Sequence, residues 1–191
     1  MKGASAWSLA CQMPLMKECP VVRSNRISFF AVVAALLTAL QLAQGCEYKA
    51  KRVAIGREAP NFAYVDLDGK TRNLTDSRGK VVMLRFWADW CPPCAKEFPI
   101  IEKTYQEVRG KGLDVIAVNV RQSEARVRDY TGKFRCSYTI ALDRDGRIAE
   151  LYGVKGLPMN FIVGRDGSIR EVIIGTISDV AMLKQFLTPY L

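Results

Sequence analysis

Two cysteines separated by two residues, Cys91 and Cys94, are the residues of this sequence that most clearly indicate a chemical function. Such a pair has three common meanings: half of a zinc site, a covalent haem attachment, or a dithiol that forms and breaks a disulfide. Zinc would need two further ligands, and after residue 45 only the solitary Cys46 and Cys136 are left. Haem attachment normally places His after the second cysteine, where this chain has Ala95. The redox dithiol is the interpretation that remains.

Histidine is absent from the whole sequence. Its absence excludes His-based acid–base catalysis, His-activated nucleophiles and nearly every common zinc or copper site. Chemistry in this chain must therefore rest on cysteine, carboxylates, lysine or tyrosine. We expect neither a metal nor a cofactor.

The dithiol lies where a predicted strand ends and a predicted helix begins. Unpaired N–H groups and the helix dipole at that position favour a thiolate at Cys91, and Cys94 one turn further on is within reach for a disulfide. Pro92 and Pro93 suit the first turn of a helix but remove two N–H donors. The limited thiolate stabilisation argues for a reductant rather than a strong oxidant.

The elements around the dithiol form a predicted strand–helix–strand unit. The apolar run 80–87 (KVVMLRFW) suits a central strand, and apolar residues at helical spacing predict a helix over 91–108 that kinks at Pro99. Gly110 and Gly112 should end this helix, and 113–120 (LDVIAVNV) is a second buried strand. Such a unit predicts a parallel strand pair with a right-handed crossover.

Further elements are predicted on both sides of this unit. Asp68-Gly69 between alternating apolar residues predicts an N-terminal β-hairpin, and Arg165-Asp166-Gly167 predicts a second one. The remaining predictions are helices over 123–134, 148–152 and 178–190 and strands over 138–142, 160–163 and 168–174. The fold class is therefore α/β, with a central sheet flanked by helices.

The first 45 residues resemble a targeting segment. Residues 27–44 carry no charge over 18 positions and follow Arg23 and Arg26, as in an export signal. The sequence Leu42-Ala43-Gln44-Gly45-Cys46 resembles a bacterial lipobox, in which Cys46 would be lipidated after cleavage. An uncleaved membrane anchor and ordinary signal cleavage stay open, and Met16 is an alternative start. All three interpretations place the later residues outside the cytoplasm.

The domain organisation follows from these segments. We assign 1–45 to targeting, 46–57 to a polar tether and 58–191 to one folded domain, because 191 residues leave no room for a second full domain. The formal net charge is +9, but the basic residues are interspersed with acidic ones rather than clustered. We therefore expect no nucleic-acid binding.

The stretch 86–99 (FWADWCPPCAKEFP) closely resembles the TlpA/ResA group of membrane-tethered thioredoxin-like proteins. The likeness extends over about residues 58–190 and includes Ala59-Pro60-x-Phe62 and the segment 153–158 (GVKGLP). It implies a thioredoxin-like fold with a mixed central sheet and an N-terminal hairpin extension. It also implies that Cys91 is the exposed nucleophile, Cys94 the resolving thiol, and Pro158 a cis-proline that faces the disulfide where a substrate strand docks.

Several side chains near the dithiol have two interpretations. Glu97 is either a solvated acid of the first helical turns or, as the resemblance implies, a proton-handling carboxylate near the thiols. Arg85 stands where the family often has Asn, and we expect it to extend into water rather than to lend charge to the dithiol. We expect Cys136 to be a buried, small apolar residue rather than a third redox thiol. Trp87 and Trp90 are expected mainly to pack, with Trp90 also shielding the disulfide.

These observations predict an extracytoplasmic, membrane-tethered thiol–disulfide oxidoreductase. The resemblance implies a reductase of disulfides in exported proteins such as apocytochrome c, supplied with electrons by an inner-membrane donor of the DsbD/CcdA type. The alternative is a copper-handling or general periplasmic redox lipoprotein in which the dithiol binds Cu(I). A peroxidase would need a lone peroxidatic cysteine in its own loop, and none is evident.

Overall fold

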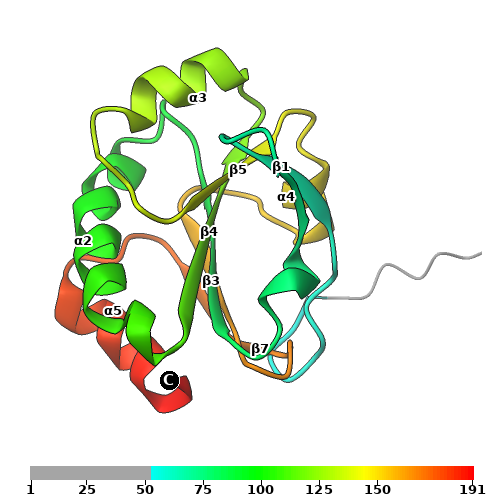
Figure 1. Ribbon diagram of the computed structural model, residues 1–191, viewed down its shortest axis with the longest axis vertical. Coiled ribbons are helices and arrows are strands. Elements are labelled where there is room, and N and C mark those ends of the chain that lie inside the picture. The colour runs from blue at the N-terminus through cyan, green and yellow to red at the C-terminus, as the bar shows by residue number, and fades with distance from the viewer. Residues whose placement is uncertain (1–52) are drawn as a thin grey trace, which may run out of the picture. The chain divides into compact units, whose positions relative to one another are not determined.

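The computed structural model describes residues 53–191 (Figure 1). The targeting segment 1–45, the lipidation candidate Cys46 and the tether up to residue 52 lie outside the described residues. Within 53–191, none of the helices combines the length and the apolar character needed to cross a bilayer. The elements are β1 (Ala63–Asp66), β2 (Thr71–Asn73), η1 (Leu74–Ser77), β3 (Val81–Trp87), α2 (Pro92–Val108), η2 (Arg109–Lys111), β4 (Leu113–Val120), α3 (Glu124–Thr131), β5 (Thr139–Asp143), α4 (Arg147–Leu151), β6 (Met159–Val163), β7 (Ile169–Ile174), α5 (Val180–Leu187) and η3 (Thr188–Tyr190).

A seven-stranded mixed sheet with the order β2-β1-β5-β4-β3-β6-β7 forms the centre of the described domain. Strand β4 pairs in parallel with both β3 and β5, as the strand–helix–strand prediction requires. Strand β6 pairs antiparallel with β3 and β7, and β1 antiparallel with β2 and β5. The sheet is continuous because the N-terminal hairpin and the C-terminal hairpin each extend one edge of the parallel core.

Helices cover both faces of the sheet (Figure 1). One apolar cluster joins α2, α3 and α5 to the sheet through buried residues such as Phe98, Val127 and Leu183. The opposite cluster contains Ile148 of α4 and side chains from the segment that leads into β1, such as Phe62. All seven residues of β3 are buried, as expected of a strand that lies between two layers.

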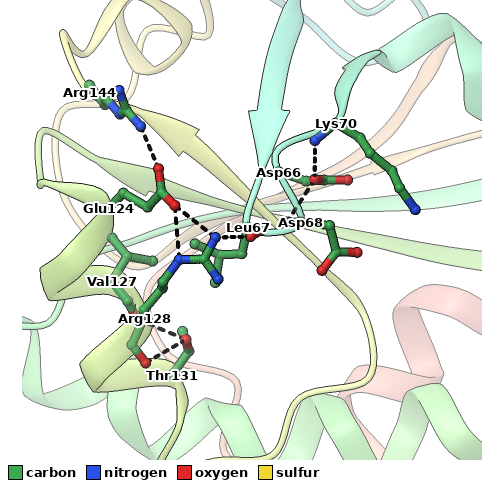
Figure 2. A network of polar contacts seen from close by, with 9 residues as sticks. All are labelled: Asp66, Leu67, Asp68, Lys70, Glu124, Val127, Arg128, Thr131 and Arg144. Atoms are coloured by element: carbon green, nitrogen blue, oxygen red, sulfur yellow. Dashed lines mark hydrogen bonds and ion pairs between the residues drawn. The ribbon is translucent and has the colours of Figure 1, made fainter.

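The buried carboxylate of Asp66 stabilises the turn of the N-terminal hairpin. This carboxylate accepts hydrogen bonds from the backbone N–H groups of Asp68 and Lys70 and from Arg72 Nε. Figure 2 shows this turn next to α3, where Arg128 reaches the carbonyl oxygen of Leu67. The predicted hairpin extension is therefore confirmed, and it is attached to the sheet through β5 and to α3 through Arg128.

The strands and helices follow their predicted positions, with differences at the ends. Helix α3 ends at Thr131 rather than Phe134, and the chain leaves it through a left-handed residue at Arg135 (φ 48°). The last helix becomes a 3-10 turn after Leu187, where Pro189 follows. Residues 56 and 57, which we assigned to the tether, exchange backbone hydrogen bonds with Ile169 at the start of β7.

Candidate active site

Cys91 and Cys94 form a disulfide at the junction between β3 and α2. The sulfur atoms are 2.07 Å apart and the Cα atoms 5.3 Å apart. Cys94 is completely buried, whereas Cys91 keeps 3% of its surface exposed. The resemblance implies an exposed nucleophile at Cys91, but Cys91 is buried in this oxidised form and is only slightly more accessible than Cys94.

The start of α2 explains why the two sulfurs meet. Cys91 is the N-cap, and its sulfur accepts the backbone N–H of Cys94 at 3.3 Å. Pro92 and Pro93 occupy the first helical positions, where a missing N–H breaks no helical hydrogen bond. The helix continues through Pro99 to Val108. The Cys91 sulfur thus lies at the positive end of a long helix, which favours its thiolate after reduction.

A buried ion pair lies behind the disulfide. Arg85 and Glu97 are both fully buried, and Arg85 Nε donates to Glu97 Oε2 at 3.1 Å. Arg85 Nη2 also donates to the carbonyl oxygen of Cys94 at 2.5 Å, and its guanidinium lies 4.4 Å from the centre of the Phe98 ring. The prediction that Arg85 extends into water is wrong, because β3 is covered on both faces and leaves this side chain no route to solvent.

Glu97 is likewise not a solvated acid. Its Oε1 accepts the backbone N–H of Ile177 at 2.7 Å, so the carboxylate joins α2 to the segment before α5. Burial raises the pKa of Glu97, while Arg85 and the Ile177 N–H act in the opposite direction. A raised pKa favours the protonated form, so Glu97 binds a proton more readily than a solvated glutamate does.

The loop that carries the disulfide is anchored by a polar network that the sequence patterns did not reveal. The backbone N–H of Asp89 donates to Gln122 Oε1 at 3.0 Å, and Gln122 Nε2 donates to Asp89 Oδ1 at 2.5 Å. Arg126 at the start of α3 pairs with the other carboxylate oxygen, and Asn119 donates to Gln122 Oε1 at 2.8 Å. Asp89 thereby attaches the turn before Cys91 to the turn after β4.

The peptide bond between Leu157 and Pro158 is cis, as the resemblance implies. Leu157 and Trp90 line the same pocket, which has a volume of about 470 Å³, together with Val154 and Lys155. The segment before the cis-proline therefore lies beside the residue that precedes Cys91.

The two tryptophans differ in their surroundings. Trp87 is buried and packs edge-to-face on Phe98, with 4.8 Å between ring centres. Trp90 is 65% exposed, so the expectation that it mainly packs is wrong. Its position in the turn between strand and helix leaves the ring on the surface.

Cys136 is partly buried and unbonded, with its sulfur 3.4 Å from the hydroxyl oxygen of Tyr138. Burial raises the pKa of its thiol, which lowers its thiolate fraction and its reactivity.

Within residues 53–191, no three His, Cys, Asp or Glu side chains gather as a metal site would require. The Cys91 and Cys94 sulfurs are bonded to each other in this structure.

Comparison with known proteins gives one consistent result. A family model described as the AhpC/TSA family matches residues 55–172. The thiol-disulfide oxidoreductase ResA of Bacillus cereus is 34% identical over 157 residues, which cover 81% of this chain and 91% of the relative. The ResA of Bacillus subtilis is 35% identical over 127 residues, covering 66% of this chain and 71% of the relative.

Solved structures agree with these relatives. A Chlorobium tepidum protein assigned as thiol:disulfide interchange protein DsbE superposes with a TM-score of 0.69 at 32% identity, covering 72% of this chain and 98% of the other. A Bacteroides thetaiotaomicron protein assigned as a protein disulfide isomerase gives a TM-score of 0.67 at 30% identity, covering 73% and 91%. The chain therefore belongs to the AhpC/TSA family and is a thioredoxin-like thiol–disulfide oxidoreductase of the ResA and DsbE type, with Cys91 and Cys94 as its cysteine pair.

Proposed function

We propose that this oxidoreductase works outside the cytoplasm as a reductase of disulfides in exported proteins. The observation that carries the exchange mechanism is the asymmetry of the disulfide, and the first turn of α2 supports the reducing direction. Cys91 has the accessible surface and the helix N-cap position, whereas Cys94 is sealed behind it. A client disulfide can therefore approach Cys91, while Cys94 is kept for the intramolecular step.

The reaction follows from this asymmetry. In the reduced protein the Cys91 thiolate attacks one sulfur of a client disulfide, which forms a mixed disulfide and releases the other client sulfur as a thiolate. Cys94, once deprotonated, then attacks the Cys91 sulfur and releases the second client thiolate. The client gains two electrons, and the protein is left with the disulfide seen in this structure. A donor must return two electrons before the next cycle.

The first turn of α2 supports the reducing direction. A strong oxidant needs an unusually stable reduced form, which requires strong stabilisation of its thiolate. Pro92 and Pro93 supply no N–H group, and the Cys91 sulfur accepts the N–H of Cys94 alone among the first-turn groups. The thiolate is thus stabilised, but by fewer donors than a helix N-terminus can offer.

We assign the client-facing and proton-handling roles to two further residues. The cis-proline Pro158, which is buried directly after the pocket-lining Leu157, would position the segment on which a client strand lies beside the disulfide. Glu97 would hold the proton that leaves Cys94 during the second step, since burial raises the pKa of its carboxyl. Glu97 is connected to the Cys94 backbone through Arg85, which donates to both.

The compartment and the partners complete the proposal. The lipobox-like sequence ending at Cys46 would tether the domain to a membrane by lipidation, and residues after it would act outside the cytoplasm. Exported proteins that carry cysteines, apocytochrome c among them, are the proposed clients. That compartment has no cytosolic reducing pool, so a membrane donor of the DsbD/CcdA type would re-reduce the pair.

The direct test is to incubate the reduced protein with an oxidised peptide that carries the Cys-x-x-Cys-His sequence of a haem-attachment site. We expect rapid peptide reduction and an equilibrium potential nearer to the roughly −270 mV of thioredoxin than to the roughly −120 mV of DsbA. A potential near the DsbA value, or oxidation of reduced peptide by the disulfide form, would contradict the reductase assignment. Mass spectrometry of the mature protein tests the tether, since an unmodified residue other than Cys46 at its N-terminus would exclude lipidation.

A further inference from the structure

Three fully buried polar side chains, those of Arg85, Glu97 and Asn160, lie between the sheet and helix α2, behind the disulfide. Arg85 of β3 and Asn160 of β6 are direct partners in the antiparallel pairing, so their side chains point to the same side of the sheet. Glu97 of α2 reaches Arg85 from the helix that covers this face. All three have no exposed surface.

The Arg85 guanidinium is held on several sides. Its Nε donates to Glu97 at 3.1 Å, its Nη2 donates to the Cys94 carbonyl oxygen at 2.5 Å, and the Phe98 ring lies 4.4 Å from its central carbon. Glu97 is fixed in turn by the Ile177 N–H at 2.7 Å. A permanent positive charge therefore touches the backbone of the resolving cysteine.

Stability does not account for this arrangement. Arg85 Nη1 and both amide atoms of Asn160 are buried without a hydrogen-bond partner among the described residues. Buried ion pairs are often no more stabilising than apolar side chains of similar volume, and unsatisfied buried polar atoms are a cost. Buried ionisable groups with perturbed pKa values are concentrated at functional sites, so the position of Arg85 against Cys94 points to a role in the chemistry.

The positive charge of Arg85 influences the thiolates that form at Cys91 and Cys94 when the disulfide is reduced. Reduction creates thiolates at Cys91 or Cys94, and a nearby cation favours them, whereas the Glu97 carboxylate opposes them. Within 53–191, Arg85 is the charged side chain that acts on Glu97, and its field also reaches Tyr130 from α3 and Cys136 and Tyr138 from the segment before β5. The balance between Arg85 and Glu97 therefore determines the local charge next to the thiols.

We propose that Arg85 is a positioning residue of the dithiol centre, which holds the Glu97 carboxylate beside the resolving cysteine and couples the charge of that carboxylate to the reduction equilibrium of the disulfide. The inference rests on the dithiol exchange proposed above, and it assigns a role to the buried cation of β3.

The test is a double-mutant cycle of Arg85→Met and Glu97→Gln, read as the equilibrium constant with glutathione between pH 5 and 9. With Arg85 present, Glu97→Gln leaves the guanidinium uncompensated, so we expect the equilibrium to shift about tenfold toward the reduced protein, or about 30 mV. With Arg85→Met, Glu97 loses the cation that lowers the pKa of its carboxyl, so its neutral form is favoured more than in the wild type. Glu97→Gln should then change the constant less than about twofold at pH 7.

An effect of Glu97→Gln that is equal in both backgrounds would overturn the proposal. Arg85→Met alone leaves Glu97 buried without its partner and can impair folding, but the double variant removes both charges and keeps the cycle measurable. Arg85→Lys retains the charge, and we expect at least a threefold effect of Glu97→Gln in that background. Loss of the effect there would also contradict coupling through charge.

The chain offers a matched control. Arg128 and Glu124 form an exposed ion pair on α3 (Figure 2), and no hydrogen bond within residues 53–191 joins either side chain to Cys91 or Cys94. Arg128→Met and Glu124→Gln should change the glutathione equilibrium less than twofold, singly or together. Because glutathione replaces the client in these measurements, failure of the wild type to reduce client peptides would count against the proposed function and not against the coupling.

Discussion

The backbone of Cys94 is held at both of its polar groups, because its N–H donates to the Cys91 sulfur at 3.3 Å and its carbonyl oxygen accepts a hydrogen bond from Arg85 Nη2 at 2.5 Å. Both contacts involve backbone atoms of Cys94 and do not depend on its sulfur. The first turn of α2 is thus connected to the nucleophilic cysteine on one side and to β3 on the other. Reduction of the disulfide can proceed while these contacts hold the turn in place.

Replacement of Cys94 by alanine should therefore trap the client rather than unfold the site. Cys94→Ala keeps the backbone contacts with Cys91 and Arg85 but removes the sulfur that resolves the mixed disulfide. We expect the variant to accumulate a mixed disulfide with the client, which is seen as a mass shift on non-reducing gels and is cleaved by a reducing agent. Cys91→Ser is the matched control and should give no such adduct. An adduct formed equally by Cys91→Ser would assign the nucleophile to Cys94.

The elements could be predicted from sequence because their signals are local. Gly-containing turns, a mainly apolar segment over 113–120 and a Cys-Pro-Pro-Cys helix start are each readable within a few residues. Arg85 shows the limit of such patterns. We expected Arg85 to extend into water, although it lies inside a strand predicted to be buried. Its pairing with Glu97 depends on how β3 and α2 pack.

The anchor of the active-site loop was not predictable for the same reason. Asp89 and Gln122 are 33 residues apart and meet only because the ends of β3 and β4 are adjacent in the parallel sheet. Their polar side chains have no spacing that distinguishes them from ordinary loop residues. Such contacts are determined by tertiary structure and not by any local pattern.

Asp66 should make the stability of the domain depend on pH. Burial acts to raise the pKa of Asp66, but hydrogen bonds from Arg72, Lys70 and Asp68 outweigh it and hold the pKa below its ordinary value of 3.8. A carboxyl with a lowered folded pKa stabilises the fold above its unfolded value and loses that contribution as the pH falls through the folded value. We expect Asp66→Asn to cost about 1–3 kcal/mol at pH 7, and this cost should decrease as the pH falls below 3.8 and through the lowered folded pKa of Asp66.

Urea denaturation at several pH values measures this difference. Asp68→Asn is the control, because its carboxylate makes no hydrogen bond within the described residues although its backbone lies in the same turn. A difference between wild type and Asp66→Asn that stays constant from pH 7 to pH 2 would show that the carboxylate charge is not the cause.

The hydroxyl of Tyr152 should contribute to stability through a long-range hydrogen bond. Tyr152 is 1% exposed, and its hydroxyl donates to the carbonyl oxygen of Pro60 at 2.7 Å. Tyr152→Phe keeps the ring contacts with Phe62 and Phe86 but leaves a buried carbonyl unsatisfied. We expect a loss of about 1–2 kcal/mol in the free energy of unfolding. The hydroxyl of Tyr130 has no hydrogen bond within residues 53–191. Tyr130→Phe should therefore change the free energy of unfolding by less than about 0.5 kcal/mol.

Trp90 should matter for client exchange and not for folding. Its ring is 65% exposed beside the pocket that Val154 and Leu157 line, whereas Trp87 is fully buried. Trp90→Ala should change the free energy of unfolding by less than about 0.5 kcal/mol, because little of the ring leaves water on folding. Loss of an apolar contact with the client should lower kcat/KM for peptide reduction about tenfold, equivalent to about 1.4 kcal/mol of transition-state binding.

Trp87→Ala provides the contrast, with an expected loss of about 3–5 kcal/mol in stability because the buried ring leaves a cavity between β3 and α2. Both variants are compared by urea denaturation and by initial rates of peptide reduction, with glutathione as a second substrate that is too small to fill the pocket. If Trp90→Ala slows glutathione and peptide equally, the ring acts on the disulfide itself. If only the peptide reaction slows, Trp90 is part of the surface on which the client strand lies.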